Sequence, residues 1–464
     1  MLQRSREWLV LVLIAALPFH ALFVTVATKI IAGPGQSPLP ILALWKEAAI
    51  VMTLLIAVLE CLRKLKIENL QLKIDVLDIC ILVLLLWSVV QLLIFNLPFS
   101  IFHYALGFKY DFLPLVTFLL LRRAPWSPWF TQAASTALLV AGGIVAVYGI
   151  LADMLPLSWF TALGYSDLHS LYVPGGPLAP FQQIESIGIR RMQSTFAGPN
   201  QLGLWLLIPF SLSAVDLIRA RSFVRLFVCS LLITSIVLTF SRAAWIAAAV
   251  IVGIAAWKAL PKKQLLTATC SLLTLAIVFT VAFPGVVLRA TSSSGHIERP
   301  LHALKIMIDH PFGLGLGSAG PASNRFSDAC VDLPAGSDAS WAAAHPSLCV
   351  FVGGAQVQPV GRACSCPQLP ENWYLQMGVE LGVLGLVLSL MLPLLVLGKL
   401  KIENVTLKEK FSIFNFQSSI FLAFLGISIA ALFLHAWEDS AVAVTVWILI
   451  ATALTSPQKR SLSP

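Results

Sequence analysis

The chain has 464 residues, of which 58% are hydrophobic and 11% are charged, and its formal net charge is +9. Soluble domains usually contain about 25% charged residues, so this composition excludes an ordinary soluble protein and predicts a membrane protein. The positive charge does not indicate nucleic-acid binding, because the basic residues form short clusters between apolar stretches.

Apolar stretches with few charges recur along the whole chain, and several are shorter than the roughly 20 residues that cross a bilayer unaided. They cover residues 8–28, 41–61, 76–96, 102–121, 131–153, 199–218, 226–240, 243–257, 265–284, 373–397, 411–434 and 440–455. We therefore expect an all-α fold, a single polytopic membrane domain over residues 1–464 with about 12 transmembrane helices. The first stretch has no clear cleavage site, so we expect a retained anchor.

Basic clusters alternate between these stretches. If Arg4 and Arg6 are cytoplasmic, the clusters after the second, fourth, sixth, eighth, tenth and twelfth stretches fall on the same side. The positive-inside rule then predicts a multi-pass protein of the cytoplasmic (inner) membrane, with both termini in the cytoplasm.

Two long segments, residues 154–198 and 285–372, would lie on the other side, and loops of this length are usually functional or disordered. Within the large extracytoplasmic loop 285–372, Pro300 and the apolar residues after it predict a short helix that ends before Pro311, followed by a glycine turn. The topology rule does not explain the cationic residues on this side, which are Arg190, Arg191, Arg242, Arg289, Arg299, Arg325 and Arg362.

Four of the eight cysteines lie in or beside apolar stretches, and the other four lie in the long loop. The loop cysteines are Cys330, Cys349, Cys364 and Cys366. An oxidising compartment would allow disulfides among them, in any connectivity. Cys364 and Cys366 also resemble half of a zinc site, but no CxxC pair accompanies them.

The first candidate site lies where segment 154–198 meets the next apolar stretch. Arg190 and Arg191 precede a Gly-Pro-Asn-Gln sequence in which Asn200 is a plausible N-cap. A helix N-terminus with two guanidinium groups beside it would bind an anion. The alternative is that both arginines contact lipid headgroups or extend to the interface.

A second candidate is Arg242, in a Ser-Arg turn between two short apolar stretches. A charge at this depth usually faces a cavity, a partner or a substrate. The planar guanidinium group binds two phosphate oxygens at once, so a phosphate-binding function is favoured over a structural one.

Two further motifs contain acid–base groups. His296 and Arg299 precede a glycine-rich turn that lacks the lysine and serine of a nucleotide-binding loop, which argues against an ATPase. Glu371 precedes an Asn-Trp-Tyr-Leu-Gln helix start, where it would act as a base or complement the helix dipole. His435, Glu438 and Asp439 form another polar cluster on the same side.

Four segments together resemble the O-antigen ligase and polymerase superfamily, which includes lipid A-core ligases, repeat-unit polymerases and protein O-oligosaccharyltransferases. These segments are Arg191 to Gln201, Ser241-Arg242, Pro311 to Gly317 and Asn372 to Gln376, within residues 186–395. The resemblance implies a GT-C-like bundle that takes part in surface polysaccharide biosynthesis. It implies transfer of a glycan from undecaprenyl diphosphate to an acceptor hydroxyl, with inversion and without a metal or other cofactor.

The same resemblance assigns the site residues. Arg191 and Arg242 match the arginines that hold the diphosphate, with Arg190 and Asn200 beside them. Family ligases typically carry a histidine before the Asn of the helix start, where this chain has Glu371, so Glu371 is the expected catalytic base. The alternatives for the base are His296 and His345 from the long loop, with Arg299 as a further candidate residue.

Partners would be the lipid-linked donor, a glycan or lipid acceptor and membrane lipids, and a polymerase or ligase is slightly favoured over a protein glycosyltransferase. A transporter or flippase of lipid-linked sugars is the main alternative. It is less favoured because the charges and both long loops gather on one side of the membrane. A scaffold of an envelope-assembly complex is a third possibility.

Overall fold

The computed structural model describes residues 1–68, 74–94, 101–170, 173, 176–184, 187–219, 222–259, 261–288, 290–400 and 413–455. Most of them are helical. The helices of the first half are α1 (Leu2–Ala16), α2 (His20–Ala32), α3 (Pro40–Ala43), α4 (Trp45–Glu68), α5 (Val76–Ile94), α6 (Ile101–Gly107), α7 (Leu113–Leu121), α8 (Pro128–Asp153), α9 (Leu157–Ala162) and α10 (Pro199–Arg219). Those of the second half are α11 (Phe223–Leu238), α12 (Arg242–Ala259), α13 (Lys262–Ala282), α14 (Pro284–Val287), α15 (Ala290–Asp309), α16 (Gly320–Ser323), α17 (Trp373–Lys399), α18 (Ile413–Ala430) and α19 (Ser440–Thr455).

The apolar stretches of the sequence are helical over most of their described residues. Within the described part of the chain, five helical segments are long and apolar enough to cross a membrane. They are Leu2–Ala32, Val76–Leu93, Ile101–Leu121, Pro128–Asp153 and Trp373–Lys399, and three shorter apolar helices accompany them. A mostly helical membrane protein is therefore supported by length and composition, whereas the number of about 12 spans stays a prediction.

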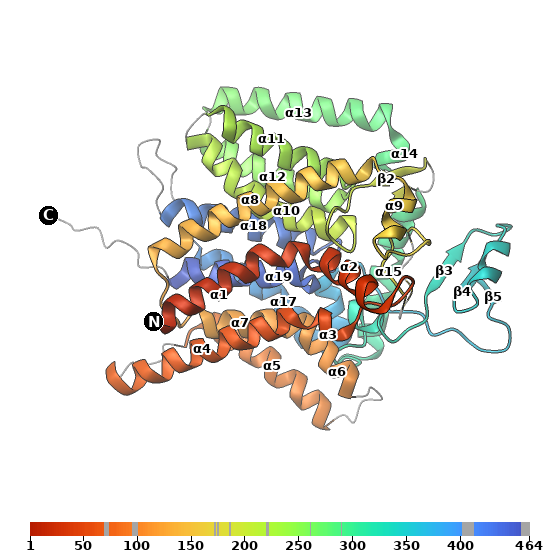
Figure 1. The fold of residues 1–464 in the computed structure, drawn as a ribbon, viewed down its shortest axis with the longest axis horizontal. Helices are drawn as coiled ribbons and strands as arrows, with labels where there is room; N and C mark the ends of the chain where they lie inside the picture. The colour runs from red at the N-terminus through yellow and green to blue at the C-terminus, as the bar shows by residue number, and fades with distance from the viewer. Residues whose placement is uncertain are drawn as a thin grey trace.

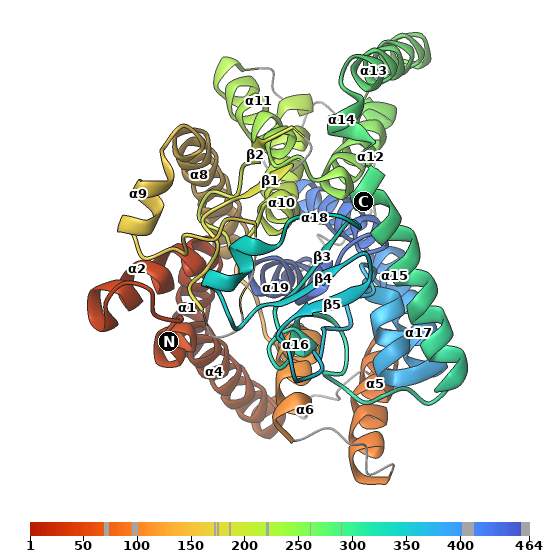
Figure 2. The same ribbon diagram turned by 90° about the vertical axis from the view of Figure 1, so that its right-hand side faces the viewer.

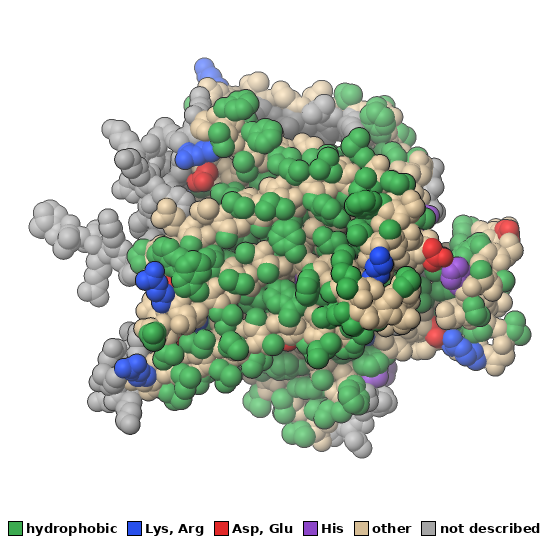
Figure 3. Space-filling model, viewed as in Figure 1, with side chains coloured by type: hydrophobic (Ala, Val, Ile, Leu, Met, Phe, Trp, Pro, Cys, Tyr) green, Lys and Arg blue, Asp and Glu red, His purple; other side chains and the backbone are tan. Residues whose placement is uncertain are grey.

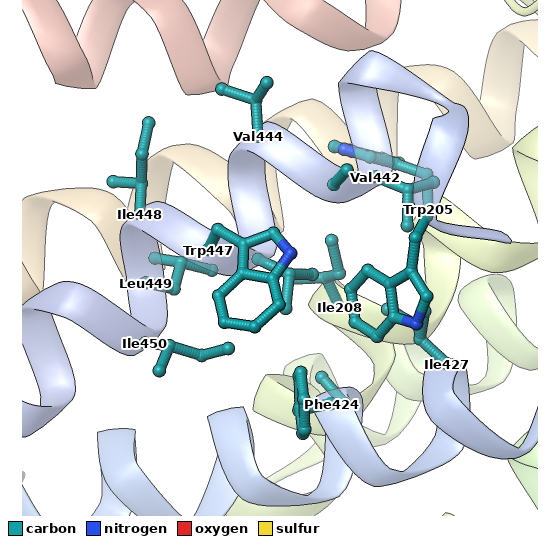
Figure 4. Close-up of a cluster of buried hydrophobic side chains, with 14 of the residues drawn as sticks. Trp205, Ile208, Phe424, Ile427, Val442, Val444, Trp447, Ile448, Leu449 and Ile450 are labelled. Atoms are coloured by element: carbon teal, nitrogen blue, oxygen red, sulfur yellow. The ribbon is translucent and has the colours of Figure 1, made fainter. Parts of the chain in front are cut away.

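The centre of the molecule is formed by α10, α18 and α19, which lie inside the bundle in Figure 1. Residues Ala441 to Ala453 of α19 are all buried, as expected for a helix that is apolar on every side. Figure 4 shows the side chains of Trp205, Phe424 and Trp447 packed in this core, and the rings of the last two lie 5.7 Å apart.

The flanks of the bundle are apolar, as Figure 3 shows for one face. Large hydrophobic side chains are exposed there, including Leu55, Leu86, Leu151 and Phe227. The few charged side chains of this face lie mostly toward its two ends. An exposed apolar surface of this extent is unusual for a soluble monomer and fits contact with lipid.

One end of the bundle, here called the charged end, holds arginines paired with carboxylates. Arg6 on α1 is fully buried and its Nε lies 3.1 Å from an oxygen of Glu60 on α4. Arg122 pairs with Asp75 at 2.7 Å and with Asp78 at 2.8 Å. Basic residues predicted on the cytoplasmic side therefore meet at one end, although the side of the membrane stays a prediction.

The opposite end, the loop end, carries the strands and faces the viewer in Figure 2. Strands β1 (Gln182–Ile184) and β2 (Ile189–Arg191) form an antiparallel pair. A second sheet has the order β3 (Cys330–Leu333), β4 (Cys349–Val352) and β5 (Ala355–Gln358), with β3 parallel and β5 antiparallel to β4. The sequence did not predict these strands.

Two disulfides staple the second sheet, as the cluster of loop cysteines predicted. Cys330 is bonded to Cys366, and Cys349 is bonded to Cys364. The buried apolar cluster of this segment is small and consists of Ala329, Ala342, Leu348 and Val350. A core of this size contributes little stability, so the two disulfides are needed to keep the segment folded.

The predicted short helix after Pro300 is longer than expected, because α15 runs from Ala290 to Asp309 and contains Pro300. It does end before Pro311, and the glycine turn follows it. A Cβ atom on Gly313 would lie 2.3 Å from the Glu380 carbonyl oxygen, and one on Gly317 would lie 2.1 Å from a backbone oxygen of α6. The turn therefore packs directly against α17 and α6.

Candidate functional site

Arg190 and Arg191 point in different directions, which corrects the prediction that both guanidinium groups lie beside the N-terminus of α10. Both belong to β2, and successive side chains of a strand point to opposite faces. The guanidinium group of Arg190 donates a hydrogen bond of 2.5 Å to the Leu155 carbonyl, just beyond the end of α8. It also lies over the Phe181 ring. Cations are favourable at a helix C-terminus, so Arg190 has a structural function there.

Arg191 points toward α10 and α11 and is held by three oxygens. Its Nε donates to the Thr239 carbonyl at 3.1 Å, Nη1 to Gln182 Oε1 at 2.9 Å and Nη2 to Asn200 Oδ1 at 2.7 Å. The helix α10 begins at Pro199, so Asn200 is not the N-cap that the sequence suggested. Its amide instead positions the guanidinium group of Arg191.

Arg242 lies at the first position of α12, directly after a tight turn. Phe240 in this turn has a φ of 49°, in the left-handed region, so the chain reverses sharply between α11 and α12. Nη1 of Arg242 lies 3.3 Å from the Val287 carbonyl and 3.2 Å from the Leu288 carbonyl. These carbonyls lie just before α15, so Arg242 contacts the start of the large loop.

Glu371 directly precedes α17, whose N-cap is Asn372. The Asn372 side chain accepts a hydrogen bond from the Leu375 amide at 3.0 Å, which confirms the predicted helix start. Glu371 has a φ of 57°, a conformation that costs a residue with a side chain about 1–2 kcal/mol. Its carboxylate forms an ion pair with Arg299 and lies 3.8 Å from His296 Nδ1.

His296 lies beside Glu371, and the charges of the other candidate residues act on it. Burial lowers the pKa of His296, the carboxylate of Glu371 opposes this shift, and the positive charges of Arg242, Arg299 and Arg191 add to it. The structure thus brings four predicted site residues, from β2, α12, α15 and the start of α17, close enough to His296 to affect its charge. We call Arg191, Arg242, His296, Arg299 and Glu371 the arginine–carboxylate site.

A polar network inside the protein supports the start of α17. The indole N–H of Trp373 donates a hydrogen bond of 3.1 Å to Asp111. Glu380 accepts hydrogen bonds from the Gly317 and Ala319 amides, both at 3.1 Å. All three hydrogen bonds join α17 to other parts of the chain. They therefore fix the helix that follows Glu371.

His435, which the sequence marked only as part of a polar cluster, belongs to the same network. The side-chain amide of Gln376 donates to Glu438, and its oxygen lies 2.5 Å from Nδ1 of His435. His435 Nδ1 is therefore the donor and Nε2 carries the lone pair. Burial lowers the pKa of His435 to about 4, with opposing effects of the Glu371 and Arg299 charges, and burial raises the pKa of Glu438.

Other predicted residues of the large loop make their contacts within the segment of the stapled sheet. His345 lies in this segment, its carbonyl accepts from Gln358 at 3.0 Å, and no described contact joins its side chain to the arginine–carboxylate site. Arg362 donates to both oxygens of Asp328 at 2.9 Å. Arg289 lies outside the described residues. The sulfur of Cys364 is not available to bind zinc, because it forms a disulfide with Cys349.

Neither a protein-family model nor a curated protein sequence matches the chain. The likeness to a family therefore rests on the four motifs alone. Two of these motifs contribute Arg191 and Arg242 to the arginine–carboxylate site. A third, Asn372 to Gln376, directly follows Glu371, the position at which the chain departs from the family. The glycine turn from Pro311 to Gly317 contributes packing against α17 instead.

Proposed function

We propose that the chain is a membrane glycosyltransferase that moves a glycan from a polyprenyl diphosphate to an acceptor hydroxyl, of the O-antigen ligase or polymerase type. The observation that supports it most is a series of contacts that joins the candidate residues. Arg191 bonds the carbonyl of Thr239 in the turn before Arg242, Arg242 contacts the carbonyls just before α15, and Arg299 and His296 of α15 lie against Glu371. Guanidinium groups and a carboxylate are the groups that such a transfer uses to bind the leaving group and to accept a proton.

In this proposal the acceptor oxygen attacks the anomeric carbon from the face opposite the diphosphate, while its proton passes to the Glu371 carboxylate. The bond between the anomeric carbon and the phosphate oxygen breaks, and its electron pair leaves with the diphosphate. Arg191 and Arg242 stabilise the charge that develops there. The three hydrogen bonds of Arg191 hold its guanidinium group in place before the reaction begins.

The finer predictions about the fold belong to the same proposal. They are a GT-C-like bundle of about 12 spans in the inner membrane, with cytoplasmic termini and the loop end on the outer side. The disulfides Cys330–Cys366 and Cys349–Cys364 favour this orientation, because disulfides form and persist in oxidising compartments.

Glycan transfer by the full-length protein, purified in detergent with a labelled lipid-linked donor and an acceptor glycan, tests the proposal. Detergent removes the two compartments, so a transporter or flippase would give no product. We expect Arg242→Ala to lower the transfer rate about 100- to 1,000-fold, the usual effect of removing one donor that stabilises transition-state charge.

Arg362→Ala is the matched control, because Arg362 is an arginine of the loop end whose partner is Asp328. It should keep the transfer rate of the wild type. Equal rates for Arg242→Ala and the wild type, at equal amounts of folded protein, would refute the proposed function. Absence of transfer by the wild-type protein would refute it as well.

A further inference from the structure

A cavity of about 290 Å³ opens beside the arginine–carboxylate site, between α15 and the segment that leads into α17. Its polar lining includes Glu298, Arg299 and His302 on α15, Asp332 on β3 and Gln368. This volume lies near the lower end of the roughly 300–1,000 Å³ typical of small-ligand pockets.

The wall opposite α15 is cross-linked. Cys330 and Cys366 both line the cavity and are bonded to each other, which ties β3 to the segment before α17. Pro367 and Pro370 in that segment restrict its backbone further. The cavity is therefore built from a helix on one side and a stapled segment on the other, and its shape is largely fixed.

The cavity lies next to Glu371. Pro370, which lines it, directly precedes Glu371 in the chain, and Arg299 both lines it and forms the ion pair with Glu371. Along α15, Arg299 lies three residues after His296 and three before His302, so it neighbours each of them on the helix surface. The helix α15 thus begins near Arg242, carries the partner of Glu371 in its middle and lines the cavity further along.

The chemistry of the lining suits a ligand rich in hydroxyl groups. Glu298 and Asp332 offer acceptors, Arg299 offers donors, and His302 offers either. A sugar hydroxyl both donates and accepts, so it matches such a mixed set. Two carboxylates would disfavour an anionic headgroup. The side chains of Glu298, His302 and Asp332 are exposed, and the apolar residues that also line the cavity, such as Ile306 and Leu369, suit the carbon face of a sugar ring.

We propose that this cavity binds the acceptor of the transfer, a saccharide that presents one hydroxyl to Glu371 while its other hydroxyls contact His302 and Asp332. The proposal rests on the proposed function, since Glu371 is the proton acceptor there. It assigns a saccharide rather than a lipid or a peptide as the acceptor, and places the acceptor on the side of Arg299 away from the two diphosphate-binding arginines.

Acceptor kinetics of the purified full-length protein test this assignment. The probe is the free repeat-unit oligosaccharide, released by mild acid from the lipid-linked donor of the same cell. We expect His302→Ala and Asp332→Asn each to raise the KM for this acceptor about three- to tenfold, the effect of losing one hydrogen bond. The KM for the donor and kcat should change less than about twofold.

The chain offers matched controls for both substitutions. His310→Ala changes another exposed histidine, just after α15, and Asp338→Asn changes another exposed carboxylate of the stapled segment. Neither residue lines the cavity, so both variants should keep the acceptor KM of the wild type. An unchanged acceptor KM in both cavity variants would overturn the assignment, as would transfer to a peptide but not to the oligosaccharide.

A direct titration separates failure of this subsite from failure of the proposed function. The oligosaccharide is titrated into the wild-type protein and His302→Ala without donor, with binding followed by saturation-transfer NMR. Weaker binding by the variant would support the subsite even if no transfer occurred. No binding to the wild type would overturn the subsite, whereas loss of transfer in Arg242→Ala would still support the proposed function.

Discussion

Two arginine–carboxylate pairs at opposite ends of the molecule use the same chemistry in different surroundings. At the charged end, Arg6 is fully buried and Glu60 is 7% exposed. At the loop end, Arg299 is 49% exposed and Glu371 is 20% exposed. A buried pair cannot lose one partner without leaving a charge in an apolar environment, whereas an exposed pair can exchange its partner for water or a ligand. The first pair therefore holds helices together, and the second is able to act on a substrate.

Breaking the buried pair should have the largest effect on stability. Arg6→Met leaves Glu60 without its partner, and it removes the contacts of Arg6 with the Pro125 carbonyl and the Trp126 ring. We expect it to lower the free energy of unfolding by about 3–5 kcal/mol. Thermal melting in detergent measures this loss, and the double variant with Glu60→Leu should recover much of it. A melting temperature unchanged by Arg6→Met would contradict the structural function.

Acidification should have an intermediate effect through His435. Its folded pKa of about 4 lies below the usual value of about 6.5, so the unfolded chain takes up the proton first as the pH falls. Keeping His435 neutral costs the folded state nothing above about pH 6.5. As the pH falls toward 4 the free energy of unfolding decreases, by about 2 kcal/mol at pH 5.

The pH effect is measured as the fall in melting temperature between pH 7 and pH 5. Glu438, whose pKa is raised, has the opposite pH dependence, so the wild type is compared with His435→Gln at each pH. The wild type should lose more stability than the variant over this interval. An equal loss in both proteins would show that His435 is not buried as a neutral group.

Breaking the exposed pair should have the smallest effect on stability. Arg299→Ala is expected to change the free energy of unfolding by less than about 1 kcal/mol, because exposed ion pairs contribute little. Glycan transfer should nevertheless fall about 10- to 100-fold, since Glu371 loses the group that orients it. The two measurements together sharpen the contrast with Arg6, and Arg299→Lys should restore part of the activity. A large loss of stability in Arg299→Ala would remove the contrast.

The helical part of the fold could be predicted because the apolar stretches are long and the charges lie between them. Trp205, Phe424 and Trp447 lie in such stretches and are buried in the helical core, whereas Leu55 and Leu86 lie in equally apolar stretches and are exposed, so composition predicts the helices but not their buried faces. The start of α17 was equally predictable, because the Asn372 side chain forms the N-cap that its residue type favours.

Other features depend on contacts between distant parts of the chain, which one sequence does not show. The short pair β1 and β2 sends Arg190 and Arg191 to opposite faces, and three-residue strands leave no clear alternation in the sequence. The pairing of Arg299 with Glu371 joins α15 to the start of α17, and the stapled sheet separates these two residues in the sequence. Only the three-dimensional packing of these elements determines which cation meets which carboxylate.

The glycine turn that packs on α17 also restricts how the sequence can change. Gly313, Gly317 and Gly382 all have left-handed φ angles, and a Cβ atom at each would overlap a backbone oxygen. Backbone atoms cannot move aside as a flexible side chain can, so no other amino acid fits these positions while the turn stays docked. Deep mutational scanning should find all three intolerant to every substitution. The spacing of these glycines, with Glu380 just before the last of them, is a pattern by which very distant relatives of this fold could be identified.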